Sequence, residues 1–391
     1  MRDEDSFRHP CNFPALQAAG DFREEGGMKL LIILLLIGLV AAAGCVQEQK
    51  MRETEPYKFG AALQLSGPQA FYGNLVKYGI ELATEDINSA GGINGRPVVA
   101  LFEDTASDRA QAAEAAQKLI QVNRIDALFT ITPWVAGVVA PIAEENKVPY
   151  IYIGSVNVFA LNKTYVFKDY PSPQDLCEIL TKKALEEGHR KIALFGTNDE
   201  VTLFCREGAE RLTNLDVFET YNYGDKDFRT QFTKIKDSGA SALILYAQVA
   251  DCPTTFKQIK ELGISVQLLL PVQSFACGSA DNTAANVDVL EGSYGSDIAL
   301  DENRRDTAFV SFRKRLEEKG WLLNIRGSAL AYDVVHEMAK AYSGCNNSLC
   351  AVNNIRSLQM QGLTGNISYN GTQIVKRQVM LTKFVNGTWG E

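Results

Sequence analysis

The sequence predicts an α/β fold with two lobes, each built on its own parallel sheet. Apolar, β-rich runs alternate with segments of helical periodicity between Tyr57 and Ile153, and the alternation restarts at Pro173. Strands that alternate with helices in this way build parallel sheets. The length of 391 residues also exceeds one ordinary compact domain and indicates two.

The first alternation opens with a β-rich strand that stops at the turn signal Ser66-Gly67-Pro68. In the helix that follows, Ile80, Ala83 and Ile87 share one face. Gly91-Gly92 ends that helix. The expected strands are Tyr57–Leu65, Val98–Glu103, Asp126–Ile131 and Val148–Ile153, and the expected helices are Gly79–Ser89, Asp108–Gln121 and Val135–Asn146.

The second alternation repeats this order with apolar strands after each helical segment. Its expected helices are Pro173–Glu187, Phe204–Thr213, Phe228–Ser238 and Thr254–Leu262, and its expected strands are Lys191–Gly196, Asp216–Tyr223, Ala242–Tyr246 and Val266–Leu270. Ligands of open parallel sheets sit at the carboxyl ends of the strands. The loops that follow the strands are therefore the expected site.

Composition excludes several classes of protein. Hydrophobic residues make up 46% and charged residues 22%, which rules out a disordered, collagenous or polytopic membrane chain. The net charge of −8 disfavours nucleic-acid binding, which needs a basic face. Only three His are present, so metal binding and His-based acid–base catalysis have few candidates.

Two motifs that would suggest an enzyme fail on inspection. The run Gly91-Gly92-Ile93-Asn94-Gly95 follows a helix, whereas a dinucleotide-binding loop follows a strand. His336-Glu337 could begin a zinc motif, but Lys340 fills the second His position, and an exposed helical His is expected there. We therefore expect no enzyme, no cofactor and no metal, with a secreted α/β enzyme as a distant alternative.

The N-terminus has the layout of a targeting signal. Lys29 precedes the apolar run Leu30–Val40, which ends in small residues before Cys45. The run is too short for a comfortable membrane span. We expect residues 1–27 to lie upstream of the true start, 28–44 to form a signal peptide and 45–56 to form a tether. The end of the run resembles a lipoprotein signal, which would make Cys45 a lipidated membrane anchor; a plain signal peptide is the alternative.

Six further Cys favour disulfides over metal ligation, because their number is even and the chain is exported. Cys345 and Cys350 flank a short polar loop, Cys252 and Cys277 each follow an apolar strand, and Cys177 and Cys205 remain for each other. Six Cys allow fifteen pairings, so the sequence favours this choice without proving it.

Several motifs together resemble type I periplasmic binding proteins, the branched-chain amino-acid (Leu/Ile/Val) receptor family. They are Leu65–Gly73, Glu85–Arg96, Asp104–Ile120, Lys226-Asp227-Phe228, Ala331-Tyr332-Asp333 and Gly362-Leu363-Thr364-Gly365. The resemblance implies two Rossmann-like lobes with parallel sheets, joined by a three-crossover hinge. Residues 57–167 and 296–344 would form the first lobe, and residues 168–295 and 345–391 the second.

The resemblance also implies a function. Such a protein is an extracytoplasmic, monomeric receptor that closes its lobes over a small solute and delivers it to the membrane permease of an ABC importer. The alternative with the same fold is the ligand-sensing subunit of a signalling system. The residues that match ligand-binding positions of the family, or lie in the same loops, are Tyr72, Pro133, Trp134, Gly154, Ser155, Val156, Gln248 and Gln273.

One family feature is missing from this sequence. Amino-acid receptors of the family hold the solute ammonium with an acidic side chain after the strand that ends near Pro271, and residues 271–277 contain no carboxylate. A buried ammonium without an anionic partner is costly. We therefore expect an amide, an aromatic acid or another weakly charged solute rather than an aliphatic α-amino acid. Asp251, or cation–π contact with an aromatic face, could replace the missing carboxylate.

Overall fold

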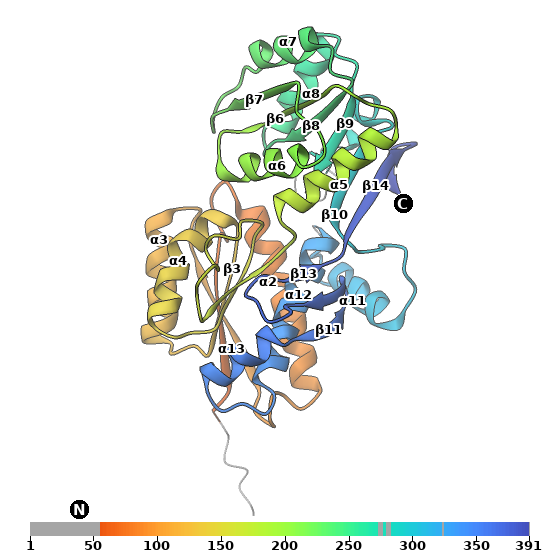
Figure 1. Cartoon of the computed structure of the whole chain (residues 1–391). Coiled ribbons are helices and arrows are strands. Elements are labelled where there is room, and N and C mark those ends of the chain that lie inside the picture. Colours follow the sequence, from red (N-terminus) through yellow and green to blue (C-terminus); the bar gives the residue numbers. More distant parts are fainter. Residues whose placement is uncertain (1–54, 273–276, 279–282, 323, 391) are drawn as a thin grey trace, which may run out of the picture. The chain divides into compact units, whose positions relative to one another are not determined.

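The structure is a computed structural model that describes residues 55–272, 277–278, 283–322 and 324–390 (Figure 1). In these ranges no helix is both long enough and apolar enough to cross a membrane. The expected signal peptide, Cys45 and Gln273 lie outside the described residues.

The first sheet is entirely parallel, with its strands in the order β2-β1-β3-β4-β5. Its elements are β1 (Tyr57–Leu63), α2 (Ala70–Ser89), β2 (Val98–Asp104), α3 (Arg109–Gln117), the π-helical turn η1 (Lys118–Val122), β3 (Ala127–Ile131), α4 (Pro133–Glu145), β4 (Tyr150–Ile153) and β5 (Val166–Asp169). Every residue of β3 is buried, because both faces of a parallel sheet are covered.

Helix α2 begins at Ala70 rather than at the expected Gly79. Glycine disfavours helix, yet here it allows close packing. A Cβ on Gly79 would lie 2.2 Å from the Ser328 carbonyl oxygen, and one on Gly73 would lie 2.0 Å from that of Gln64. Gly73 and Gly79 are thus the residues that let this helix approach its neighbours.

The second sheet has the order β15-β14-β10-β9-β8-β6-β7, and only β14 and β15 are antiparallel to their neighbours. Its strands are β6 (Ile192–Thr197), β7 (Val217–Tyr221), β8 (Ala242–Tyr246), β9 (Gln267–Pro271), β10 (Tyr294–Ile298), β14 (Val379–Val385) and β15 (Thr388–Gly390). Its helices are α5 (Pro173–Glu186), α6 (Glu200–Glu210), α7 (Arg229–Ser238), α8 (Cys252–Glu261) and α10 (Val287–Leu290). The expected α/β architecture with two parallel sheets is confirmed.

The boundary between the lobes differs from the expected one. Helices α11 (Thr307–Glu318), α12 (Ile325–Tyr342) and α13 (Ser348–Arg356) precede a small antiparallel sheet of β11 (Gln359–Gly362), β12 (Gly365–Ser368) and β13 (Lys376–Arg377). Val352, Ile355 and Tyr369 are buried in the same core as Phe59. Residues 345–377 therefore belong to the first lobe, because their apolar side chains complete its core. The expected first lobe includes the residues from Ser296 onward. Strand β10, which contains Ser296, instead pairs with β9 in the second sheet.

A buried ion network lies where two connections leave the first lobe, after β5 and after β13. The side chains of Asp169 and Arg377 have 0% exposed surface. Arg377 Nη2 donates to Asp169 Oδ2 at 2.7 Å and to Glu337 Oε1 at 2.8 Å. Arg377 Nη1 donates to Thr364 Oγ1 at 2.5 Å. The ion pair therefore links the ends of two strands that lead to the second lobe.

Carboxylates outnumber cations in this network. Asp333 Oδ2 lies 3.8 Å from Arg377 Nη1 and makes a third acid beside one guanidinium. Burial raises the pKa of Glu337 well above its ordinary value, and the negative charge of Asp169 raises it further. Tyr369 donates its hydroxyl to Glu337 Oε2 at 2.8 Å. Glu337 thus keeps its proton to a higher pH than an exposed glutamate.

The three disulfides have the pairings that the sequence favoured. Cys177–Cys205 links α5 to α6 with a Cα–Cα distance of 5.3 Å, and Cys252–Cys277 spans 5.2 Å. Cys345–Cys350 closes the short loop before α13 with a Cα–Cα distance of 5.6 Å.

We predict that Arg377→Met destabilises the protein by about 3–5 kcal/mol, because it leaves buried carboxylates without their cation. Glu337→Gln should cost far less, since the amide resembles the protonated carboxyl. The pKa of Glu337 is higher in the folded protein than in the unfolded chain, where it is about 4.3. Glu337 therefore stabilises wild type most at pH values below the unfolded pKa, and this stabilisation is lost as the pH rises through the folded pKa. The stability of Glu337→Gln should not show this loss as the pH rises.

Urea unfolding of the three proteins at pH 5 and pH 8 measures both effects. An equal cost for the two variants, or an unchanged pH dependence in Glu337→Gln, would contradict this account of the network.

Candidate functional site

A cavity of about 830 Å³ lies at the carboxyl ends of strands from both sheets. The loops after β1, β3 and β4 form one wall, and the loops after β6, β7 and β8 form the other. This is the strand edge at which open parallel sheets bind ligands. Its volume is in the range of about 300–1,000 Å³ found for small-molecule sites.

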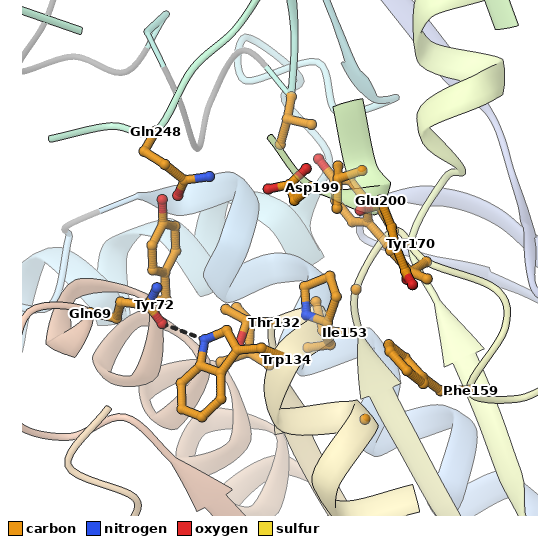
Figure 2. Close-up of a pocket in the computed structure, with 18 of the residues that line it drawn as sticks. Gln69, Tyr72, Thr132, Trp134, Ile153, Phe159, Tyr170, Asp199, Glu200 and Gln248 are labelled. Atoms are coloured by element: carbon orange, nitrogen blue, oxygen red, sulfur yellow. Dashed lines mark hydrogen bonds between the residues drawn. The ribbon is translucent and has the colours of Figure 1, made fainter. Parts of the chain in front are cut away.

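The cavity is lined by all the expected ligand-binding residues that the structure describes. They are Tyr72, Pro133, Trp134, Gly154, Ser155, Val156 and Gln248. Figure 2 shows the Tyr72 ring, from the first lobe, directed toward Gln248 of the second. Gln273, the remaining candidate, lies outside the described residues.

Trp134 dominates the first wall, and its orientation is fixed. Its Nε1 donates to Gln69 Oε1 at 2.7 Å, the bond drawn in Figure 2. Pro133 occupies the first position of α4 and has no N–H to offer a solute. Thr132 precedes it with φ of 76°, a conformation that is costly for a β-branched residue and occurs mainly at functional sites.

The loop after β4 supplies a carboxylate with the Ser155 hydroxyl. Ser155 is buried and lines the cavity together with Tyr246 of the opposite wall. Burial raises the pKa of Tyr246 above its ordinary value. The Val156 side chain is 1% exposed and has no hydroxyl, and its carbonyl accepts the Tyr152 hydroxyl at 2.5 Å. Val156 therefore adds no side-chain donor to the one that Ser155 supplies.

The second wall brings acids and phenols that the sequence did not single out. Asp199 caps α6, and its Oδ1 accepts the Thr202 N–H at 3.0 Å. Its Oδ2 accepts the hydroxyls of Thr197 at 2.7 Å and Tyr223 at 2.8 Å. Glu200 follows it at the cavity. Both acids lie in a loop that was expected to border the site, but an Asp before a helix indicates only a cap in the sequence.

Asp251, which could have replaced the missing family acid, does not line the cavity. It is 5% exposed, and it accepts the Tyr221 hydroxyl at 3.1 Å and Lys226 Nζ at 3.1 Å. Arg109, Asp199 and Glu200 are the charged residues among the described lining. Burial raises the pKa of Tyr72 to about 12, so this phenol stays protonated and can donate a hydrogen bond.

His336 is half-buried on α12 rather than exposed as expected. Its ring centroid lies 4.5 Å from that of Tyr332, and burial lowers its pKa. Among the described residues, no group of three or more His, Cys, Asp or Glu could hold a metal ion.

The family model described as periplasmic binding protein matches residues 56–388, and the chain belongs to this family. Leu/Ile/Val-binding protein homolog 3 of Brucella melitensis biotype 1 is 27% identical over 221 residues, which cover 54% of this chain and 59% of the relative. Leu/Ile/Val-binding protein homolog 7 of Brucella suis biovar 1 is 25% identical over 291 residues, which cover 69% of this chain and 70% of the relative. The match thus spans only 59% of the length of the first relative.

Solved structures share the fold. The branched-chain amino acid transporter substrate binding protein LivJ of Streptococcus pneumoniae, in complex with isoleucine, matches with a TM-score of 0.77 and 21% identity over 86% of this chain and 98% of that chain. An ABC transporter solute binding protein of R. palustris, in complex with 4-hydroxybenzoate, matches with a TM-score of 0.74 and 18% identity. The match covers 86% of this chain and 95% of that chain. The family consists of binding proteins rather than enzymes, which confirms the expectation from the sequence.

We predict that Tyr72→Ala and Trp134→Ala each weaken solute binding roughly ten-fold without unfolding the protein, because each removes an aromatic face of the cavity. Tyr78→Ala is the matched control: Tyr78 lies on the same helix as Tyr72 but stacks on Trp321 at 4.6 Å. Calorimetric titration with any solute that stabilises wild type provides the measurement. Unchanged affinity in both cavity variants would disprove the site.

Proposed function

We propose that this protein is the extracytoplasmic solute-binding receptor of an ABC importer. It closes its two lobes over a small solute and delivers it to a membrane permease. It carries no cofactor and acts as a monomer. The eight residues expected from the sequence, Gln273 included, contribute to binding.

The observation that carries this proposal is the cavity lined from both sheets. A small-molecule pocket between two α/β lobes, in a chain that matches the periplasmic binding protein family over residues 56–388, favours solute capture by lobe closure. The titles of the similar structures, which name isoleucine and 4-hydroxybenzoate, indicate solutes of this size.

The chemistry of the first wall favours a weakly charged solute over an aliphatic α-amino acid. Pro133 lacks an N–H, Val156 presents no hydroxyl, and Ser155 is buried. A carboxylate placed against Pro133 and Val156 would lose water and recover few hydrogen bonds from them. An amide avoids this cost, and an aromatic acid offsets it by ring contacts that an aliphatic α-amino acid lacks.

We predict that leucine, isoleucine and valine bind no better than millimolar, whereas at least one amide or aromatic acid binds in the micromolar range. A bound solute should stabilise the protein by about 2.7 kcal/mol at a concentration 100 times its Kd. Thermal-shift screening followed by calorimetry is the measurement.

Two outcomes of this screen have different meanings. Micromolar binding of leucine would overturn the proposed solute class and leave the receptor function intact. Failure of every small solute to stabilise the protein would contradict the receptor function itself.

The proposal includes a lipid anchor at Cys45, which follows the apolar run of the expected signal peptide. We predict that wild-type protein partitions into membranes and that Cys45→Ala loses both the lipid mass and the membrane fraction. Stable anchoring requires more than one acyl chain. An unmodified mature N-terminus by mass spectrometry would disprove the anchor.

A further inference from the structure

The orientation of the Trp134 ring in the cavity depends on Gln69. An indole has one hydrogen-bond donor and no acceptor. Because the indole Nε1 only donates, the amide oxygen of Gln69 must face it, and the observed Oε1–Nε1 distance is 2.7 Å. The one polar atom of Trp134 is therefore used inside the protein, and the indole offers only its apolar ring to a solute.

A second glutamine, Gln64, contacts the same group of side chains. It directly follows β1 and is 0% exposed, and its Nε2 donates to Thr132 Oγ1 at 2.8 Å. The same nitrogen lies 3.5 Å from Gln69 Oε1 and 3.4 Å from the Ile131 carbonyl oxygen. Both amides thus belong to one chain of hydrogen bonds that runs from β1 to the cavity wall.

The hydrogen bond from Gln64 also determines whether the Thr132 hydroxyl can donate a hydrogen bond to a solute. Since Thr132 Oγ1 accepts the amide N–H, its own hydroxyl proton remains to be donated. Thr132 and Trp134 both line the cavity, on either side of Pro133. The first wall therefore presents a hydroxyl donor next to an apolar, flat ring.

We propose that Gln69 is a positioning residue that sets the solute specificity of the cavity by holding the Trp134 ring. The cavity then selects a flat, conjugated solute that bears a hydrogen-bond acceptor. The solute stacks on the Trp134 ring held by Gln69, and the Thr132 hydroxyl donates to its acceptor. This inference rests on the proposed receptor function and assigns the solute class of the same cavity. A ring of sp³ carbons makes a poorer contact with the indole face than a planar one.

The test uses a matched pair of neutral probes, benzamide and cyclohexanecarboxamide, which share a carbonyl acceptor and differ in ring planarity. Wild type should bind benzamide about five- to ten-fold more tightly. Gln69→Leu, which cannot accept the indole N–H, should lose this preference. Gln69→Glu, which keeps an acceptor oxygen, should retain it.

Indole fluorescence supplies a readout that a purely structural role of Gln69 would not move. Benzamide should quench the emission of wild type and of Gln69→Glu, and Trp134→Phe, which leaves Trp321 and Trp389, should abolish the quenching. Equal affinity of wild type for the two amides, no binding of either, or an unchanged preference in Gln69→Leu would overturn the inference. If a non-planar solute binds instead, the receptor function stands while this inference fails.

Discussion

The ion pair between Arg377 and Asp169 fixes the two chain segments on which the rest of the architecture depends. A guanidinium without exposed surface must keep its carboxylate partners, because either charge alone would be buried and unpaired. Asp169 also accepts the Gly154 N–H on its carbonyl at 3.3 Å. The next residue, Tyr170, lines the cavity and donates to Asp297 at 2.6 Å. The network at the lobe connections and the cavity wall are therefore one continuous structure.

The two walls of the cavity offer different chemistry. The first presents the aromatic rings of Trp134 and Tyr72, with Arg109 as its charged residue. The second presents Asp199 and Tyr223, which are already hydrogen-bonded to each other at 2.8 Å. A solute between them meets aromatic surface on one side and a hydrogen-bonded acid on the other. The aromatic surface of the first wall supports selection by shape and planarity.

Most of the fold could be predicted from the sequence, because strand and helix alternation is a local signal. The lobe boundary could not, since Ile355 and Tyr369 are buried in the same core as Phe59, which joins segments far apart in the chain. The sequence also did not indicate the first turns of α2, residues 70–78, and the close packing of Gly73 on Gln64 and of Gly79 on Ser328 appears only in the fold. In the same way, loop position identified Trp134 and placed Asp199 in a loop that borders the site, but nothing local indicated that Gln69 would hold the Trp134 N–H.

Native mass spectrometry of the freshly purified protein tests the receptor function most directly, since a closed two-lobe receptor retains its solute during purification. The account predicts one small molecule per chain, released on unfolding, whose composition is that of a planar, weakly charged compound. A chain that carries no solute and gains none from a metabolite extract would contradict it.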